Sequence, residues 1–153
     1  MHKGVTIIEI LVAIAVVAIM AGVGMGISIN ASKRKTVENT AILVRTQLFQ
    51  ARSHALQGKK VQCASTDKLA GWQVSFTATS MALNENCLSS GLHVTKTTTF
   101  PPGVTATPLP SPSSVDFAPV TGVPNLSTTV TVTITGSASP DILVTISPQG
   151  LIQ

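Results

Sequence analysis

Tyrosine is absent from this 153-residue chain, aromatic residues make up only 3% of it, and charged residues only 10%. One tryptophan and four phenylalanines offer few rings on which nucleic-acid bases could stack. The sequence also lacks clusters of cysteine and histidine and the motifs GxSxG, HExxH, GxGxxG and the P-loop. These absences argue against an enzyme, and we expect no catalytic residue, no metal site and no cofactor.

The ten basic residues exceed the six acidic ones, which gives a formal net charge of +4. A basic balance favours contact with nucleic acid or anionic lipid. The cations are spread along the chain, however, and the net charge falls to +3 without Lys3. We therefore expect nucleic acid to bind only weakly, with strong salt dependence and no sequence preference.

The apolar excess lies near the amino terminus, where no charged residue occurs from Ile10 to Ile27. An apolar run of about 18 residues is a transmembrane helix candidate. A secretory signal has a shorter apolar stretch, although Gly22-Val23-Gly24 offers a small-residue cleavage site. Neither a signal peptide nor a plain anchor explains Glu9, because a carboxylate in a membrane segment costs a few kcal/mol unless it has a partner.

Cleavage of the chain after Gly4 would give Glu9 a partner. It would create an α-amine on Val5, and Glu9 would become the fifth residue of the mature chain. The dipole of a helix that begins there also favours a nearby carboxylate. In a stack of parallel subunits, Glu9 could pair with the amine of a neighbour, so we interpret it as an assembly residue.

The stretch GVTIIE, from Gly4 to Glu9, and the aliphatic run after it resemble the type IV prepilin motif. The resemblance implies that prepilin peptidase removes the leader, residues 1–4, and that the new amino terminus at Val5 is methylated. Most members of the family have Phe or Met at that position. The implied partners are prepilin peptidase, the inner-membrane assembly platform, the lipid bilayer and other pilins or pseudopilins.

Two cysteines, Cys63 and Cys87, lie in the polar part of the chain. Behind a membrane-targeting segment, such a pair favours a disulfide formed in an oxidising compartment. Closing a loop of about 25 residues would contribute roughly 3 kcal/mol to stability. Two reduced core thiols are the alternative.

The prepilin resemblance makes residues 5–29 a transmembrane or filament-core helix. It implies a single-pass protein of the bacterial inner membrane with a periplasmic or extracellular head. The cluster Lys33–Lys35 would lie in the cytoplasm by the positive-inside rule alone. We follow the resemblance and the cysteine pair, which place the cluster outside. It would there contact lipid phosphates or form a solvated helix face.

Helical spacing continues after Asn30, and positions three or four residues apart form one apolar stripe. The stripe consists of Val37, Ala41, Val44, Leu48, Ala51 and Ala55, and we expect Ile42, Phe49 and Leu56 to widen it. Gly58 is a plausible C-terminal cap. One helix from Val5 to Gln57 would be about 80 Å long. Its amphipathic second half, within residues 30–58, would pack on the head.

Beyond Gly58 the apolar period changes to two, which predicts half-buried strands of an antiparallel sheet. The strands are expected at Trp72–Ala78, Val130–Ile134 and Ile142–Ile146, with weaker candidates at Val61–Cys63 and Leu92–Phe100. Prolines favour a long loop at about 101–126. Asp67, Asp116 and Asp141 are expected to cap turns.

The fold class that these elements predict is α+β. A long N-terminal helix, membrane-spanning in its first half, packs with its second half on a small antiparallel β-sheet head domain at residues 59–153. The stripe on the helix is the natural cover for the apolar face of the sheet.

Three further stretches resemble the GspH/FimT family of minor pilins and pseudopilins. They are LVRTQLFQARSHALQGKKVQC, GWQVSF and the closing ILVTISPQGLIQ. The matching features are Arg52, the helix turn at Ala55, a strand at Val61, the pair Gly71-Trp72 and the position of Cys63. The resemblance implies a pilin-like fold and incorporation into a type IV pilus or a type II secretion pseudopilus, in priming or tip assembly.

A DNA-binding minor pilin for DNA uptake is the alternative function. FimT-like members that bind DNA carry arginines after the last glycine. Here Gly150 is followed by Leu151-Ile152-Gln153, so no DNA-binding residue is assigned.

Overall fold

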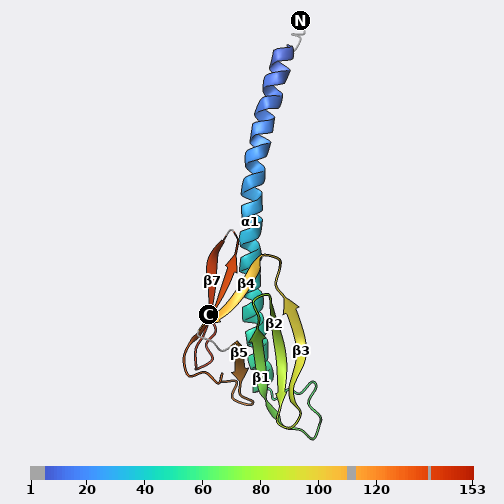
Figure 1. Cartoon of the computed structure of the whole chain (residues 1–153), viewed down its shortest axis with the longest axis vertical. Coiled ribbons are helices and arrows are strands. Elements are labelled where there is room, and N and C mark those ends of the chain that lie inside the picture. The colour runs from blue at the N-terminus through green and yellow to red at the C-terminus, as the bar shows by residue number, and fades with distance from the viewer. Residues whose placement is uncertain (1–5, 110–112, 138) are drawn as a thin grey trace.

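The structure is a computed structural model of the chain. It describes residues 6–109, 113–137 and 139–153, without the side chains of residues 23–28 and 139. The predicted leader and Val5 lie outside the described residues. A single helix, α1 (Ile7–Leu56), runs for 50 residues and projects far beyond the β-rich head (Figure 1). At 1.5 Å per residue, α1 is about 75 Å long.

All strands of the described residues follow α1. They are β1 (Leu69–Phe76), β2 (Ser80–Cys87), β3 (Gly91–Thr99), β4 (Val104–Leu109), β5 (Ser114–Phe117), β6 (Val130–Gly136) and β7 (Ser139–Ile146). They form two antiparallel sheets, with strand orders β3-β2-β1-β5 and β4-β6-β7. The α+β class is therefore confirmed, but the head contains two sheets where one was expected.

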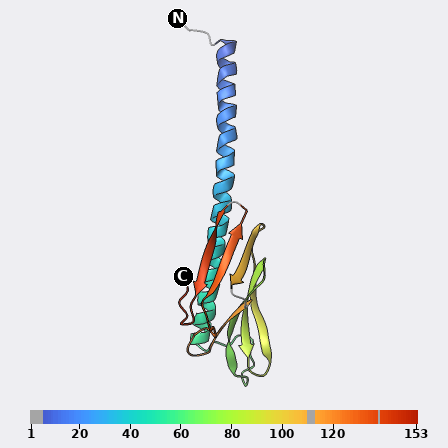
Figure 2. The same ribbon diagram turned by 60° about the vertical axis from the view of Figure 1, so that its left-hand side comes forward.

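The predicted stripe on α1 is the centre of the core. Its six residues, from Val37 to Ala55, are each at most 5% exposed. They pack against strands of both sheets, chiefly β7, β1 and β6. Figures 1 and 2 show the second half of α1 lying along the strands, while the first half extends away from them.

The expected widening of the stripe is wrong. Ile42, Phe49 and Leu56 are 61%, 49% and 47% exposed. Each follows a stripe residue directly, and one residue corresponds to about 100° around a helix. The sheets cover the opposite flank, where Thr40 and Gln47 are buried. These two polar side chains are accommodated by hydrogen bonds to Thr36 O at 2.9 Å and to Thr98 Oγ1 at 3.0 Å.

The predicted cap at Gly58 is confirmed. Gly58 has a φ of 57°, and its N–H donates to Ala55 O at 3.1 Å. The N–H of Lys59 donates to His54 O at 3.0 Å. This pair of bonds is the Schellman arrangement that ends a helix with a left-handed residue.

The strands predicted from two-residue alternation are confirmed, except that β1 ends at Phe76 and Ala78 lies outside it. Leu92–Phe100 corresponds to β3, most of which is exposed rather than half-buried. The expected strand at Val61–Cys63 is wrong, because its backbone N–H groups bond to a carboxylate. Strand β2 was not predicted, because the buried polar residues Asn84 and Glu85 hide its alternation.

The proline-rich segment at 101–126 contains two strands, β4 and β5, and so differs from the predicted loop. Residues 110–112 between them lie outside the described residues. Each of the two strands is at the edge of its sheet. An edge strand tolerates proline because one side of its backbone needs no partner, which explains Pro108 within β4.

We predict that Leu48→Ala lowers the free energy of unfolding by about 3 kcal/mol, because it leaves a cavity between the helix and the sheets. Ile42→Ala is the matched control and should change stability by about 0.5 kcal/mol or less, because Ile42 is exposed. Denaturant unfolding of the full chain in detergent, followed by the fluorescence of the buried Trp72, measures both values. Equal losses for the two variants would contradict the packing described.

Candidate functional site

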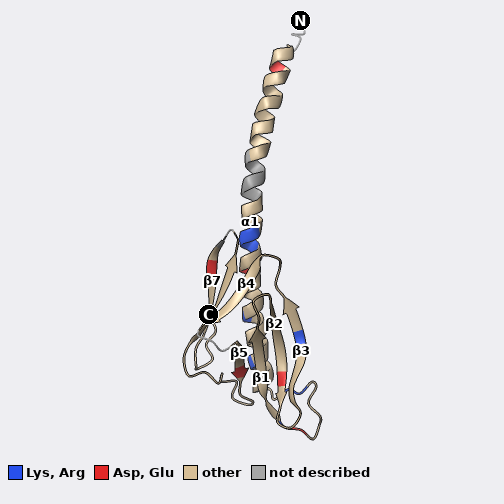
Figure 3. Cartoon of the chain, in the orientation of Figure 1, with Lys and Arg blue, Asp and Glu red and all other residues tan. Residues whose placement is uncertain are grey.

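The first half of α1, residues 7–35, is called the stalk below. Every side chain described between Thr6 and Lys35 is exposed, and those at the start are large and apolar, including Ile7 at 80% and Ile8 at 70%. Between Ile7 and Gly22 the only charged residue is Glu9. Figure 3 shows this part of the helix as uncharged apart from one acidic band. An exposed apolar surface of this length marks a contact with lipid or with another protein.

Glu9 lies in the first turn of α1. Its N–H donates to Thr6 O at 3.1 Å, and the Thr6 side chain makes no capping bond. Within the described residues, the Glu9 carboxylate has no ion-pair or hydrogen-bond partner. The positive end of the helix dipole favours its charge. The predicted processing residues Gly4 and Val5 lie outside the described residues, so pairing of Glu9 with an amine on Val5 stays a prediction.

No helix in the described part of the chain is both long enough and apolar enough to cross a membrane. The predicted span at 5–29 includes Val5 and the side chains of 23–28, which are not described.

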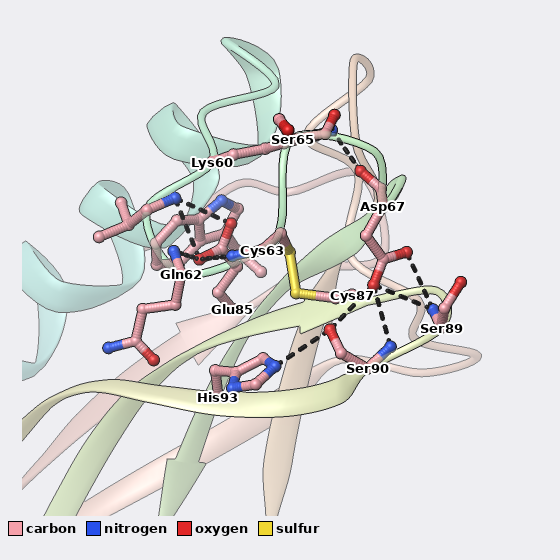
Figure 4. Close-up of a disulfide and its surroundings, with 12 residues drawn as sticks. Lys60, Gln62, Cys63, Ser65, Asp67, Glu85, Cys87, Ser89, Ser90 and His93 are labelled. Atoms are coloured by element: carbon pink, nitrogen blue, oxygen red, sulfur yellow. Dashed lines mark hydrogen bonds between the residues drawn. A yellow bond between two sulfur atoms is a disulfide. The ribbon is translucent and has the colours of Figure 1, made fainter.

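The cysteines predicted to pair are joined. Their sulfur atoms lie 1.91 Å apart, and their Cα atoms 5.7 Å apart (Figure 4). The bond connects Cys63, in the loop after α1, to Cys87 at the end of β2. We call residues 58–68 and 85–90 the disulfide corner.

Glu85 organises the disulfide corner from inside the fold. Its fully buried carboxylate accepts hydrogen bonds from the N–H groups of Val61, Gln62 and Cys63 at 3.0, 2.5 and 3.3 Å. A buried charge requires such partners. The role of Glu85 was not predicted from the sequence. A signal was nevertheless present, because Glu85 and Cys87 are two residues apart and therefore share one face of a strand.

The Glu85 carboxylate and the two cysteine sulfurs lie within 4.8 Å of one another. This is a spacing at which three ligands could hold a metal ion. Both sulfurs are consumed by the disulfide, however, and the carboxylate already binds backbone N–H groups. The donor set does not fit a metal in this state, and the group acts as a structural clamp.

Asp67 caps a turn, as predicted, but the turn is the distant one that follows β2. Its carboxylate accepts hydrogen bonds from Ser89 N at 3.0 Å, Ser90 N at 2.9 Å and Ser90 Oγ at 2.8 Å (Figure 4). The hydroxyl of Ser90 is the largest cause that lowers the pKa of Asp67 to about 2. The other two expected turn caps are wrong, because Asp116 lies within β5 and Asp141 within β7.

His54 and Trp72 join the end of α1 to β1. Their rings meet edge to face with centroids 4.6 Å apart, and Trp72 Nε1 donates to Lys59 O at 3.0 Å. Burial is the main cause that lowers the pKa of His54, and the charge of Lys59 lowers it further. The arrangement is that of a packed core contact.

Arg52 ties the helix to the end of the chain. Its Nη1 donates to Gly150 O at 2.7 Å. Gly150 has a φ of 84°, and an added Cβ would lie 3.3 Å from Arg52 Cζ. Arg52 and the closing glycine therefore have a structural role, and the guanidinium is engaged within the fold.

The remaining cations are dispersed. Lys33–Lys35 lie together on the exposed stalk, where Arg34 pairs with Glu38 at 3.0 Å. Arg45 is exposed on the second half of α1. Lys59, Lys60 and Lys68 belong to the disulfide corner, and Lys96 lies on β3. Figure 3 shows basic segments at several places along α1 and another on β3.

Comparison with protein families, with curated proteins and with solved structures gives no match for this chain.

We predict that the capped carboxylate of Asp67 makes stability depend on pH. Its pKa is about 2 in the folded chain against an ordinary value of 3.8. Because this pKa is depressed, the contribution of the Asp67 carboxylate to stability is complete above about pH 4 and is lost as the pH falls towards 2. Asp67→Asn should flatten the thermal stability curve in this window.

Asp141→Asn is the control, because Asp141 is an exposed carboxylate. It should leave the wild-type dependence between pH 4 and 2 intact. Thermal unfolding at stepped pH values measures all three chains. The same slope in wild type and Asp67→Asn would show that the cap is not formed.

Proposed function

We propose that the protein is a minor pilin or pseudopilin. It is processed by prepilin peptidase after Gly4 and is incorporated through α1 into a type IV pilus or a type II secretion pseudopilus, in priming or tip assembly. The observation that carries this proposal is the division of α1. One half has a buried stripe against the head, and the other exposes every side chain described in it.

The energetics of the stalk require a second environment. Burying one aliphatic side chain such as Ile7 or Leu11 stabilises a structure by about 1.5–3 kcal/mol. Both are more than half exposed, as are most of the large apolar side chains described between them and Met20. A lipid bilayer before assembly, and neighbouring helices afterwards, would each cover this surface. The Cys63–Cys87 disulfide supports a head on the periplasmic or extracellular side.

The position of Glu9 supports assembly rather than simple anchoring. A plain anchor gains nothing from a carboxylate in its apolar segment, because the charge makes insertion less favourable. A filament of parallel helices can satisfy the carboxylate with a cation of the adjacent subunit. The amine that cleavage would create at Val5, four residues before Glu9 in the sequence, is such a cation.

The alternative of DNA uptake has less support. Arg52 is engaged with Gly150, and the segment after that glycine contains no basic residue. Lys96 lies on β3, apart from Lys59, Lys60 and Lys68 of the disulfide corner. The aromatic side chains of the head, Trp72, Phe76, Phe100 and Phe117, are buried and offer no surface for base stacking. We therefore propose a structural role and assign no DNA-binding residue.

We predict that Glu9→Ala inserts into the membrane but reduces the amount of protein recovered in sheared filaments by about tenfold or more. The reason is the loss of a charge-assisted contact between subunits. Glu38→Ala is the matched control, because Glu38 is an acidic residue of the same helix that pairs with Arg34 at the surface. It should be recovered like the wild type. Equal recovery of Glu9→Ala and wild type would contradict the assembly role.

A further inference from the structure

A groove of about 680 Å³ opens beside β1, β2, β5 and the loop that follows β5. It lies on the face of β1 opposite the buried side chains of Trp72 and Val74, because Gln73 lines it and side chains alternate along a strand. The volume is within the range of small-molecule sites, about 300–1,000 Å³. The stalk does not contribute to it, and Asn86 is the one lining residue that also belongs to the disulfide corner.

The floor of the groove requires a glycine. A Cβ on Gly71 would lie 2.6 Å from Phe117 O, which is backbone of the neighbouring strand. Any larger residue would force β1 and β5 apart. The absence of a side chain at Gly71 lets the backbones of β1 and β5 lie close together where they line the groove.

One wall of the groove is the loop 118–125, which the end of α1 holds in place. Val120 N–H donates to Ala55 O at 2.9 Å, and a Cβ on Gly122 would lie 2.5 Å from Leu56 Cγ. Val120 has a φ of 69°, which is strained for a β-branched residue, and it is the one non-glycine residue of the described chain with a positive φ. Strain of this kind is retained where the surroundings fix it, and it is concentrated at functional sites.

The polar side chains of the groove form two sets, one bonded to other side chains of the fold and one without hydrogen-bond partners among the described residues. Gln73 Nε2 donates to Asp116 Oδ1 at 2.6 Å, and Gln73 Oε1 accepts from Asn84 Nδ2 at 3.3 Å. These bonds orient the Asp116 carboxylate. The side-chain amides of Asn86 and Asn125 also line the groove, and they form no hydrogen bond within the described residues.

The chemistry of this lining selects a class of ligand. It contains one carboxylate and no lysine or arginine, so phosphates, nucleic acid and acidic sugars are disfavoured. Amides and a carboxylate together can donate to and accept from hydroxyl groups. Val123 and Pro124 supply apolar surface for the C–H groups of a ring.

We propose that this groove binds a neutral saccharide. Asp116 and the amides of Asn86 and Asn125 bond to its hydroxyl groups. The ring packs against Val123 and Pro124 over the floor at Gly71. This activity goes beyond the proposed role in a filament and does not depend on it.

The test uses the full chain in a detergent whose headgroup contains no sugar. Chitotriose and maltotriose are the neutral probes, and trigalacturonate is the acidic one. Saturation-transfer NMR should show saturable binding of at least one neutral trisaccharide at millimolar concentration and much weaker binding of trigalacturonate. Failure of both neutral probes to bind, or equal binding of trigalacturonate, would overturn the proposal.

Variants locate the site. Asn86→Ala and Asn125→Ala should each weaken binding about tenfold without changing the melting temperature, because neither amide bonds to the described chain. Asp116→Asn should weaken binding by a similar factor, whereas Asp141→Asn, at an exposed acid on β7, should leave it unchanged. Wild-type affinity in all three groove variants would overturn the assignment of the site.

Discussion

The burial of one helix stripe against two sheets is the contact on which the rest of the structure depends. Each sheet alone has few strands and needs a cover for its apolar face. The residues from Val37 to Ala55 provide that cover for both. The contact is close, since a Cβ on Gly136 of β6 would lie 2.3 Å from Val37 Cγ2. Glycine at this position lets the strand approach the helix.

The other contacts of the head secure the carboxyl-terminal end of this helix segment. Glu85 and the disulfide hold the chain where it leaves α1, and Arg52 binds the closing turn at Gly150. The loop beside the groove is attached to the same helix end through Ala55 and Leu56. The head is therefore organised around the second half of α1, and none of these contacts involves the stalk.

Because the head uses only the second half of α1, every side chain described on the stalk is left exposed. A helix whose only role was to cover the two sheets would not need to extend beyond them towards the amino terminus. Here it continues as an apolar segment with one carboxylate near its start and no partner for that carboxylate among the described residues. The same helix therefore offers two surfaces, one used within the chain and one left for lipid or for other subunits. The proposed assembly function rests on that division.

Much of the fold could be predicted from periodicity alone. A spacing of three and four residues predicted the buried stripe, and alternation predicted β1, β6 and β7. Periodicity does not show which flank of a helix a sheet covers, so Ile42 was misplaced and the buried Gln47 was missed. Strand β2 and the role of Glu85 were hidden because their buried polar groups find partners far along the sequence.

The candidate site was predictable only where the sequence itself sets a residue apart from the rest of the chain. Cys63 and Cys87 could be paired because the chain offers no other cysteine, and Glu9 stood out because its neighbours are apolar. The groove could not be foreseen. It combines β1, the end of β2, β5 and a loop, and no spacing along the chain indicates that Asn86 and Asn125 line the same cavity.

The amino terminus of the mature protein tests the central claim most directly. The intact mass of the protein extracted from its native membrane, with sequencing of its terminal peptide, identifies where the chain begins. The proposed processing predicts a chain that starts at Val5 with a methylated amine. A chain that starts at Met1, or near Gly24 after removal of the apolar segment, would contradict the pilin assignment.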